Sequence, residues 1–390
     1  MSVGELAERY CFSRDSIEAL GRVLGLREVG RALSSLKSPG LRYFIRVNTL
    51  RASRDEVIAR LREEGLEARP HPLVDEAVYL HVEGPRQVEL LPNVVVADRK
   101  AAESVYMGAD LYKAGVLRVH GRVRTGDLVT VVDPRGLPVA VGEAAVDYDE
   151  MVGGRGLAVK VLKSVYRVPS LRGLDVYEEG LVYDQSLPAI LAVKNLAPQP
   201  GWLVVDLCSA PGGKATHAAQ LMEGGGVVVA IDRAGPKIAK LRENVKRLGM
   251  KNVRIVEADS RYIDLAFPDL RADAVIVDPP CSSLGVRPKL YCDLTARGLA
   301  SLASYQYQFL KVAARILKRG GRLLYSTCTM TLEENEANVA RAVRELGMRL
   351  VEQRIVLGRP GLLGLGKGVQ RFLPHAHDTP GFFIAALEKS

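Results

Sequence analysis

The fold of this 390-residue chain is decided by the stretch Trp202–Thr216, WLVVDLCSAPGGKAT. It reads as a short apolar run, then a Pro-Gly-Gly turn, then the start of a helix. Glycines in a turn between a buried strand and a helix let the backbone approach a bound ligand closely. The stretch therefore predicts the first strand, turn and helix of a ligand-binding α/β domain.

Strands and helices alternate beyond this stretch. Apolar runs of four to six residues are separated by segments with helical character, among them 235–249 and 299–318. The expected strands are Trp202–Leu207, Val227–Ile231, Val253–Ala258, Ala274–Val277 and Arg322–Ser326. Such runs between helices are typical of a buried parallel sheet. We therefore expect a doubly wound, Rossmann-like α/β domain with its ligand site at the carboxyl ends of the strands.

The Gly-rich turn fits neither common phosphate-binding motif. A phosphate loop needs Gly five residues before the Gly-Lys pair and Ser or Thr after it, but Cys208 and Ala215 occupy those places. A G-x-G-x-x-G dinucleotide fingerprint is also missing from the turn. Asp232 ends the second strand about 20 residues later, where a carboxylate can accept both ribose hydroxyls. With Asp206 and Asp259 ending the neighbouring strands in sequence, this layout fits S-adenosylmethionine.

Two cysteines follow the next two strands, within Asp278-Pro-Pro-Cys281 and Tyr325-Ser-Thr-Cys328-Thr. Carbon 5 of a pyrimidine is a poor nucleophile, but a thiolate that adds to carbon 6 turns the ring into an enamine-like species that can attack a methyl sulfonium. Methylation of an exocyclic amine needs no thiol and instead needs an aromatic residue after Asp-Pro-Pro. The cysteine pair therefore favours carbon-5 chemistry, and from this reasoning either cysteine could be the nucleophile.

These motifs resemble those of the NOL/NOP/Sun family of RNA cytosine-5 methyltransferases. The resemblance rests on Asp206–Lys214, Asp278–Cys281, Thr327–Thr329 and Arg371–Phe383. It implies that Cys328 is the nucleophile and that Cys281 assists product release. It also implies that Asp278 holds the amide edge of the cytosine and that Lys214 lies near the methionine or the base. The expected cofactor-binding residues are Cys208, Ser209, Ala210, Pro211, Gly212, Gly213, Lys214, Asp232, Lys237, Asp259 and Asp278.

A β-rich insert precedes this domain. The strand-like runs Val94–Ala97, Leu128–Val132, Pro138–Gly142 and Leu157–Leu162 are separated by turn residues, as in a small barrel or sandwich. The segments 108–116 and 126–129 resemble the PUA domain, a compact RNA-binding module. An insert of this kind further resembles the branch of the family that modifies the tRNA acceptor stem. A structural insert without a ligand is the alternative interpretation.

The N-terminal region reads as mixed α and β, with Arg42–Asn48 as a strand. Ser53 with Glu56 matches a helix capping box, and Thr331 with Glu334 predicts a second box at the helix after Cys328. The expected division is an N-terminal α/β RNA-binding region at 1–92, a PUA-like domain at 93–168 and a catalytic domain at 169–390.

The formal charge is +9, and +7 of it lies in residues 169–390. This excess favours an anionic partner, with nucleic acid ahead of a membrane surface. Arg287 and Lys289, in the loop after Cys281, are expected to hold phosphates. The insert carries only +2, so RNA recognition there should depend on shape and hydrogen bonds more than on charge.

Further sequence patterns indicate where the protein is located and whether it binds a metal. The N-terminus has no apolar run typical of a signal peptide, and nowhere is there a run of about 18 apolar residues. Five cysteines, an odd and scattered set, indicate a reducing compartment, so we expect a cytoplasmic protein. No C-x-x-C pair is present, and His375-Ala-His377-Asp378 lies in a stretch that the family shares without metal, so no metal is expected.

The sequence thus predicts a monomeric RNA cytosine-5 methyltransferase that uses S-adenosylmethionine and acts on tRNA. Two alternatives remain open at this point. Ribosomal RNA could be the substrate, which the PUA-like segment disfavours. The chain could also be a catalytically silent RNA-binding assembly factor, which the intact pair of Cys281 and Cys328 disfavours.

Overall fold

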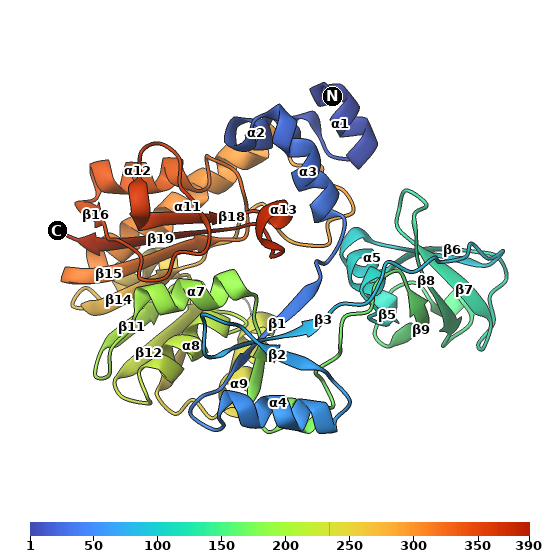
Figure 1. The fold of residues 1–390 in the computed structure, drawn as a ribbon, viewed down its shortest axis with the longest axis horizontal. Helices are drawn as coiled ribbons and strands as arrows, with labels where there is room; N and C mark the ends of the chain where they lie inside the picture. The colour runs from blue at the N-terminus through green and yellow to red at the C-terminus, as the bar shows by residue number, and fades with distance from the viewer. Residues whose placement is uncertain (234) are drawn as a thin grey trace.

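The computed structural model describes residues 1–233 and 235–390. Within these ranges the chain forms three β-sheets and a cluster of N-terminal helices (Figure 1). The largest sheet belongs to the C-terminal half of the chain, and the insert projects from one side of the molecule. The expected fold class is confirmed, namely a Rossmann-like α/β domain with an N-terminal α/β region and a small β-rich insert.

The Rossmann-like sheet has a parallel core. Its order is β13-β12-β11-β14-β15-β19-β18-β17, with β16 paired to β19. Strands β11 to β15 run parallel, and β19 pairs antiparallel with β15. The bounds are β11 Leu203–Asp206, β12 Val227–Asp232, β13 Val253–Glu257, β14 Ala272–Val277, β15 Leu317–Thr327, β16 Met348–Leu350, β17 Arg359–Pro360, β18 Val369–Phe372 and β19 Phe382–Lys389. The five predicted strands are present, whereas β16 to β19 were not predicted.

Helices cover both faces of this sheet, as a doubly wound fold requires. Side chains of α7, α8 and α9 bury one face, and side chains of α11 and α12 bury the other. The bounds are α7 Leu187–Leu196, α8 Gly213–Leu221, α9 Gly235–Leu248, α10 Ile263–Ala266, α11 Ala296–Ile316 and α12 Glu336–Glu345. No helix in the described part of the chain is long and apolar enough to cross a membrane.

One predicted capping box is formed in part and the other is wrong. Ser53 caps α4 (Arg54–Glu63), because its Oγ accepts a hydrogen bond from the Glu56 N–H at 3.2 Å. Thr331 and Glu334 do not begin a helix, since α12 begins two residues after Glu334. The Glu334 side chain is buried and bonds to a different loop of the sheet edge, so it is not free to cap a helix.

The N-terminal region forms a second sheet of order β10-β1-β3-β2. The bounds are β1 Arg42–Val47, β2 Ala68–Pro70, β3 Ala77–His81 and β10 Val182–Asp184. Helices α4 and α6 (Asp175–Glu178) contribute side chains to its core. Strand β10 follows the insert in the chain, so a segment expected for the catalytic domain supplies an edge strand of the N-terminal sheet.

Three helices precede this sheet and pack on the Rossmann-like domain (Figure 1). They are α1 Val3–Tyr10, α2 Arg14–Leu24 and α3 Leu26–Leu36. Their apolar side chains share a core with Leu284 and Cys292 from one loop and Met330 from another. Cys292 is buried in this core, as expected of a cysteine that serves as a small apolar side chain. The helices therefore cover the loops that follow the two cysteine motifs.

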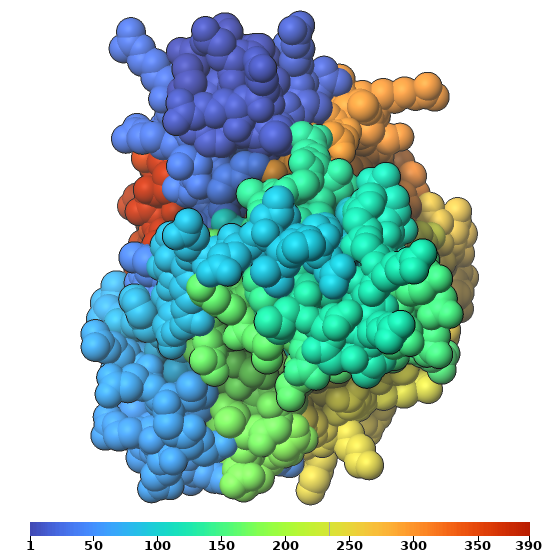
Figure 2. All heavy atoms as spheres, turned by 90° about the vertical axis from the view of Figure 1, so that its right-hand side faces the viewer, coloured from blue at the N-terminus to red at the C-terminus, as the bar shows by residue number. Residues whose placement is uncertain are grey.

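The insert is a sheet of order β5-β9-β8-β7-β4-β6 with α5 packed on it. The bounds are β4 Val94–Ala97, α5 Arg99–Tyr106, β5 Leu111–Tyr112, β6 Val116–His120, β7 Leu128–Val132, β8 Pro138–Ala144 and β9 Leu157–Ser164. All four predicted strands are present. Figure 2 shows the insert on one face of the molecule, below the N-terminal helices. A β-bridge between Glu83 and Arg167 holds its two connections to the rest of the chain side by side.

Candidate active site

The predicted cofactor loop joins β11 to α8 where the order of the sheet reverses. β11 lies between β12 and β14, and doubly wound folds bind ligands in the crevice at such a reversal. The Ala210 N–H donates a hydrogen bond to the Asp232 carboxylate at 3.1 Å, which ties the loop to the end of β12. Gly212 has a φ of 110°, and an added Cβ would lie 2.7 Å from Leu241. Only glycine fits this turn without strain.

Helix α8 is fixed from the N-terminal sheet by the buried side chain of Arg46. The guanidinium donates to the Gly213 carbonyl at 2.7 Å, to Thr216 Oγ1 at 2.9 Å and to the side-chain oxygen of Gln185. It also lies over the Tyr183 ring, 5.2 Å from the centroid. Burial lowers the pKa of Arg46 to about 9. Strand β1 therefore positions the first turn of the helix that begins at the cofactor loop.

A pocket of about 520 Å³ opens beside this loop. The predicted residues that line it are Cys208, Ala210, Asp232, Lys237, Asp259, Asp278, Cys281 and Cys328. Asp259 accepts hydrogen bonds from the Arg261 side chain and N–H, which lower the pKa of Asp259. Asp232 and Asp259 lie at adjacent strand ends, and ionised carboxylates there can accept hydrogen bonds from a nucleoside. One cavity thus brings the predicted nucleoside-binding residues and both cysteines together.

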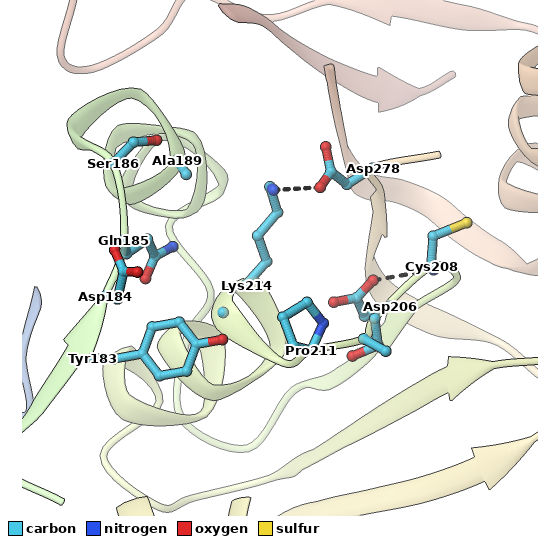
Figure 3. Close-up of a pocket in the computed structure, with 13 residues that line it drawn as sticks. Tyr183, Asp184, Gln185, Ser186, Ala189, Asp206, Cys208, Pro211, Lys214 and Asp278 are labelled. Atoms are coloured by element: carbon cyan, nitrogen blue, oxygen red, sulfur yellow. Dashed lines mark hydrogen bonds and ion pairs between the residues drawn. The ribbon is translucent and has the colours of Figure 1, made fainter. Parts of the chain in front are cut away.

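A second pocket, of about 210 Å³, shares Cys208, Ala210 and Asp278 with the first (Figure 3). The predicted residues that line it are Cys208, Ser209, Ala210, Pro211, Gly213, Lys214 and Asp278, whereas Gly212 lines neither pocket. Burial raises the pKa of Asp206, at its floor, to about 7. Gln185 is buried, and its Nε2 has no hydrogen-bond partner among the described residues. Carboxyl, amide and ammonium groups together suit the amino-acid end of S-adenosylmethionine, so the residues present fit this cofactor.

Lys214 and Asp278 connect the two pockets. Lys214 Nζ lies 2.5 Å from one carboxylate oxygen of Asp278, and Ser326 Oγ donates to the other oxygen at 3.1 Å. Asp278 follows β14 and Ser326 lies near the end of β15, so two adjacent parallel strands fix this carboxylate. Its orientation is therefore set before any substrate binds.

The two predicted catalytic cysteines face each other, with their Sγ atoms 3.2 Å apart. The pKa of Cys328 is lowered, because the Cys281 thiol hydrogen-bonds to its sulfur, as does Ser283, and Lys214 lies nearby. The pKa of Cys281 is raised by that same hydrogen bond and by burial. In the described residues neither cysteine forms a disulfide. The site thus holds one thiol poised to ionise beside one that keeps its proton.

The predicted phosphate contacts of Arg287 and Lys289 are wrong. The Arg287 guanidinium donates to the carbonyl and hydroxyl of Ser38 at 2.9 and 3.0 Å, and its side chain is only 4% exposed. Lys289 is 3% exposed and lies near Glu103 of the insert. Both cations therefore join parts of the protein, because the loop that carries them is covered by the N-terminal helices and the insert.

The segment His375–Asp378 has a structural role. Asp378 accepts a hydrogen bond from the Leu41 N–H at 3.0 Å, and His375 Nε2 lies 2.7 Å from Glu28. Across residues 1–233 and 235–390, no group of three or more potential ligands is placed to bind a metal ion.

Sequence reasoning missed three residues of the site. Ser283 lies 3.6 Å from Cys328 Sγ, and only its proximity to Cys281 in the chain could have indicated it. Gln185 lines the smaller pocket from the segment before α7, which carried no signal. Lys100 of α5 lines the larger pocket. No pattern in the sequence indicated that the insert lines the pocket that holds both cysteines.

A Rossmann-like sheet with this pocket and an opposed cysteine pair defines a class of cofactor-dependent methyltransferases. Residues 193–388 match the protein family described as 16S rRNA methyltransferase RsmB/F. Residues 93–165 match the PUA domain, and residues 40–88 match the ferredoxin-like domain found with RsmF/B-like methyltransferases. The chain belongs to the RsmB/F (NOL1/NOP2/Sun) family of S-adenosylmethionine-dependent RNA cytosine-5 methyltransferases.

Known proteins resemble the chain over almost its whole length. The tRNA (cytosine(72)-C(5))-methyltransferase of Pyrococcus horikoshii is 44% identical, over 97% of each chain. The mouse protein tRNA (cytosine(72)-C(5))-methyltransferase NSUN6 is 30% identical, over 93% of this chain and 85% of its own. The crystal structure of NSun6 from Pyrococcus horikoshii with SFG, an analogue of S-adenosylmethionine, superposes with a TM-score of 0.89 at 44% identity. It covers 97% of this chain and 99% of the crystallised chain.

Proposed function

We propose that this protein methylates carbon 5 of cytosine 72 in the tRNA acceptor stem. The observation that carries the proposal is the 3.2 Å contact between Cys281 and Cys328 in a pocket shared with the cofactor-binding residues. The choice of tRNA is supported by full-length relatives named for cytosine 72 of tRNA. It is also supported by the PUA domain, since RNA-binding modules select the substrate.

The proposed reaction begins at Cys328. S-adenosylmethionine, when bound, supplies an electrophilic methyl group. The Cys328 thiolate forms a bond to carbon 6 of the cytosine, and the electron pair of the double bond becomes available at carbon 5. Carbon 5 takes the methyl group, and the bonding pair left behind stays on the sulfur of the cofactor, which becomes a thioether. Asp278 faces the amide edge of the base and accepts a hydrogen bond from its exocyclic amino group, which orients the ring for attack by the thiolate. Its contact with Lys214 supports this role, because a fixed carboxylate needs no rearrangement during the reaction.

Release of the methylated base is the second half of the proposed mechanism. Carbon 5 must lose its proton before the bond from carbon 6 to Cys328 can break and return that thiolate. Cys281 lies beside the sulfur of Cys328 and is the residue that we assign to this step. Cys281 enters this step as a thiolate, after its proton has passed to solvent, and takes the proton of carbon 5. It is then again the thiol that hydrogen-bonds to the released Cys328 thiolate.

We also propose the functional units, the oligomeric state and the cellular location of the protein. The division into 1–92, 93–168 and 169–390 stays our proposal for the functional units, with β10 as a strand that crosses from the third unit to the first. The protein acts as a monomer, which light scattering at micromolar concentration tests. A cytoplasmic location is supported by five cysteines that are all free.

The decisive experiment uses S-adenosylmethionine with a labelled methyl group. The protein is incubated with unfractionated tRNA and, separately, with ribosomal RNA, and the RNA is digested to nucleosides. We expect labelled 5-methylcytosine from tRNA, mapped to position 72 by bisulfite sequencing. Label that appears only in ribosomal RNA would replace the proposed substrate. No label in either RNA would favour a catalytically silent assembly factor.

A further inference from the structure

Glu334 is a fully buried carboxylate at the catalytic edge of the sheet, with 0% of its surface exposed. One oxygen accepts hydrogen bonds from the Ser282 N–H and the Gln306 side-chain amide, both at 2.8 Å. The other accepts from Ser282 Oγ at 2.6 Å and from Thr331 Oγ1 at 2.8 Å. All four donors, the Ser282 N–H and hydroxyl, the Gln306 amide and the Thr331 hydroxyl, are neutral. The carboxylate is therefore satisfied by hydrogen bonds alone.

Three of these bonds, from Ser282 and Thr331, join the two loops that carry the cysteines. Ser282 directly follows Cys281, and Thr331 lies three residues after Cys328. The Ser282 hydroxyl also lies 2.7 Å from the hydroxyl of Thr329. Glu334 thus bonds at the same time to the segment after β14 and to the segment after β15. The two loops have no covalent link. The Gly285 N–H donates to the Cys328 carbonyl at 3.0 Å, and the Glu334 network supplies the side-chain bonds that join the loops.

Core packing does not explain a carboxylate at this position. A buried ionised group costs several kcal/mol unless its hydrogen bonds are complete, and an apolar side chain of similar volume is often as stable. Gln306 adds to the network, because its amide also donates to the Pro280 carbonyl at 3.1 Å, one residue before Cys281. Every partner of the Glu334 side chain thus leads to one of the two cysteine loops.

We propose that Glu334 is a positioning residue that sets the spacing between the Cys281 and Cys328 thiols. Acting through Ser282 and Thr331, it holds the two loops so that the sulfur atoms stay in contact during the catalytic cycle. The importance of this spacing for catalysis rests on the proposed function, whereas the spacing itself can be measured without RNA. A misplacement of about 1 Å costs on the order of 10²-fold in rate.

The spacing can be tested by oxidation with diamide. Two thiols give up two protons and two electrons to the N=N bond of diamide and become a disulfide, at a rate that depends on their proximity. Mass spectrometry of the linked peptides measures the Cys281–Cys328 bond separately from other cysteines. We expect the rate to fall about tenfold in Glu334→Ala. Glu334→Gln should recover most of the rate, because its carbonyl oxygen still accepts and the hydroxyls of Ser282 and Thr331 can rotate.

Activity is measured on the same variants. Glu334→Ala should lower kcat about 100-fold, with the KM for tRNA and for S-adenosylmethionine within about threefold of the unmodified protein. Gln353→Ala is the matched control, because Gln353 is also buried and donates to the Gly368 and Ile384 carbonyls, which lie outside both cysteine loops. We expect it to lose stability while its thiol oxidation and kcat stay unchanged.

Unchanged oxidation and kcat in a folded Glu334→Ala protein would overturn the proposal. If that variant does not fold, Ser282→Ala, which removes one hydroxyl of the network, serves instead. It should slow oxidation about threefold, and an unchanged rate would equally overturn the proposal. A failure of the proposed function can be distinguished from a failure of the Glu334 proposal. If the proposed function is wrong, the unmodified protein does not methylate RNA, but Glu334→Ala still slows the oxidation of the two thiols.

Discussion

Lys214 and Asp278, 64 residues apart in the chain, meet with Nζ 2.5 Å from Oδ2 at the junction of the two pockets. Ser326 binds the other carboxylate oxygen, so Asp278 presents a fixed negative edge toward the cysteine pair. A carboxylate held in this way can receive the amino group of a cytosine without moving. The contact therefore links the loop that binds the cofactor to the residue that faces the base.

The first prediction concerns this carboxylate. Asp278→Asn should lower kcat by about 10²-fold, because the amide loses the ion pair with Lys214 and a base that is misplaced by about 1 Å reacts more slowly. The Kd for S-adenosylmethionine, measured by calorimetry, should rise by less than kcat falls, because Asp278 is one of several residues that line the cofactor pocket. Asp269→Asn, at an exposed position outside both pockets, is the control. A large loss of cofactor affinity with unchanged kcat would contradict the prediction.

The second prediction separates the roles of the cysteines. Cys328→Ala should lower methyl transfer by more than about 10³-fold, as expected when a nucleophile is removed. Cys281→Ala should instead accumulate a covalent protein–RNA adduct, visible as a shifted band on a denaturing gel. Cys11→Ala, far from the pockets, should behave as the unmodified protein. An adduct formed by Cys328→Ala and not by Cys281→Ala would exchange the two roles.

The third prediction is an acid dependence of stability that involves Glu76 and His217. Burial lowers the pKa of His217 to about 4, while Glu76, despite its burial, has a pKa lowered to about 2 by hydrogen bonds from His217 and Lys194. Both values lie below those of the unfolded chain, 6.5 and 4.5, so the unfolded state binds more protons in acid. Stability should therefore be fully present above pH 6.5 and fall progressively as the pH drops toward 2.

Urea unfolding at a series of pH values measures this dependence. Glu76→Gln should lose about 3 kcal/mol at pH 7, the scale for a buried pair that loses one charge. The same variant should show a flatter profile below pH 4.5, because the titrating carboxyl is gone. A profile parallel to that of the unmodified protein would show that Glu76 does not contribute.

The fourth prediction concerns the contact of the insert with RNA at the active site. Lys100, on α5, is exposed and lines the pocket that contains both cysteines. A lysine there can neutralise one phosphate beside the target base. Lys100→Ala should reduce the slope of log affinity for tRNA against log salt by about 1, with cofactor affinity unchanged. Lys163→Ala is the control, because Lys163 is an exposed lysine of β9 that lines neither pocket. This variant should leave the slope of log affinity for tRNA against log salt unchanged, if that slope reports a contact at the pocket.

The strands of the parallel core could be predicted from the sequence, because the patterns that indicate them lie within short stretches of the chain. Each strand from β11 to β15 is a short apolar run, and the Pro-Gly-Gly turn shows where the chain must bend tightly. The insert was predictable for the same reason, since its strands are separated by turn residues. Strand β19 was missed although Phe382–Leu387 is an apolar run, because its antiparallel pairing with β15 departs from the alternation of strands and helices that identified the parallel core.

The errors at the site arise from burial, which a sequence does not state. Arg287 follows a cysteine motif in a basic loop, and such a cation is normally solvent-exposed, yet the N-terminal helices bury it against Ser38. Glu334 follows Thr331 at the spacing of a capping box, yet its real partners include Ser282, 52 residues away. A pattern of residue types can thus predict that polar groups matter without predicting which groups they meet.

The place of β10 in the N-terminal sheet has a consequence for folding during synthesis. Strands β1, β2 and β3 leave the ribosome first, but their outer partner β10 is made only after the whole insert. The insert is continuous in sequence, so it can complete its own sheet while the N-terminal sheet still lacks an edge. Domains generally fold as units in the order in which they are made. We expect the RNA-binding module to mature before the part of the chain that precedes it, and Arg46 to dock on α8 last.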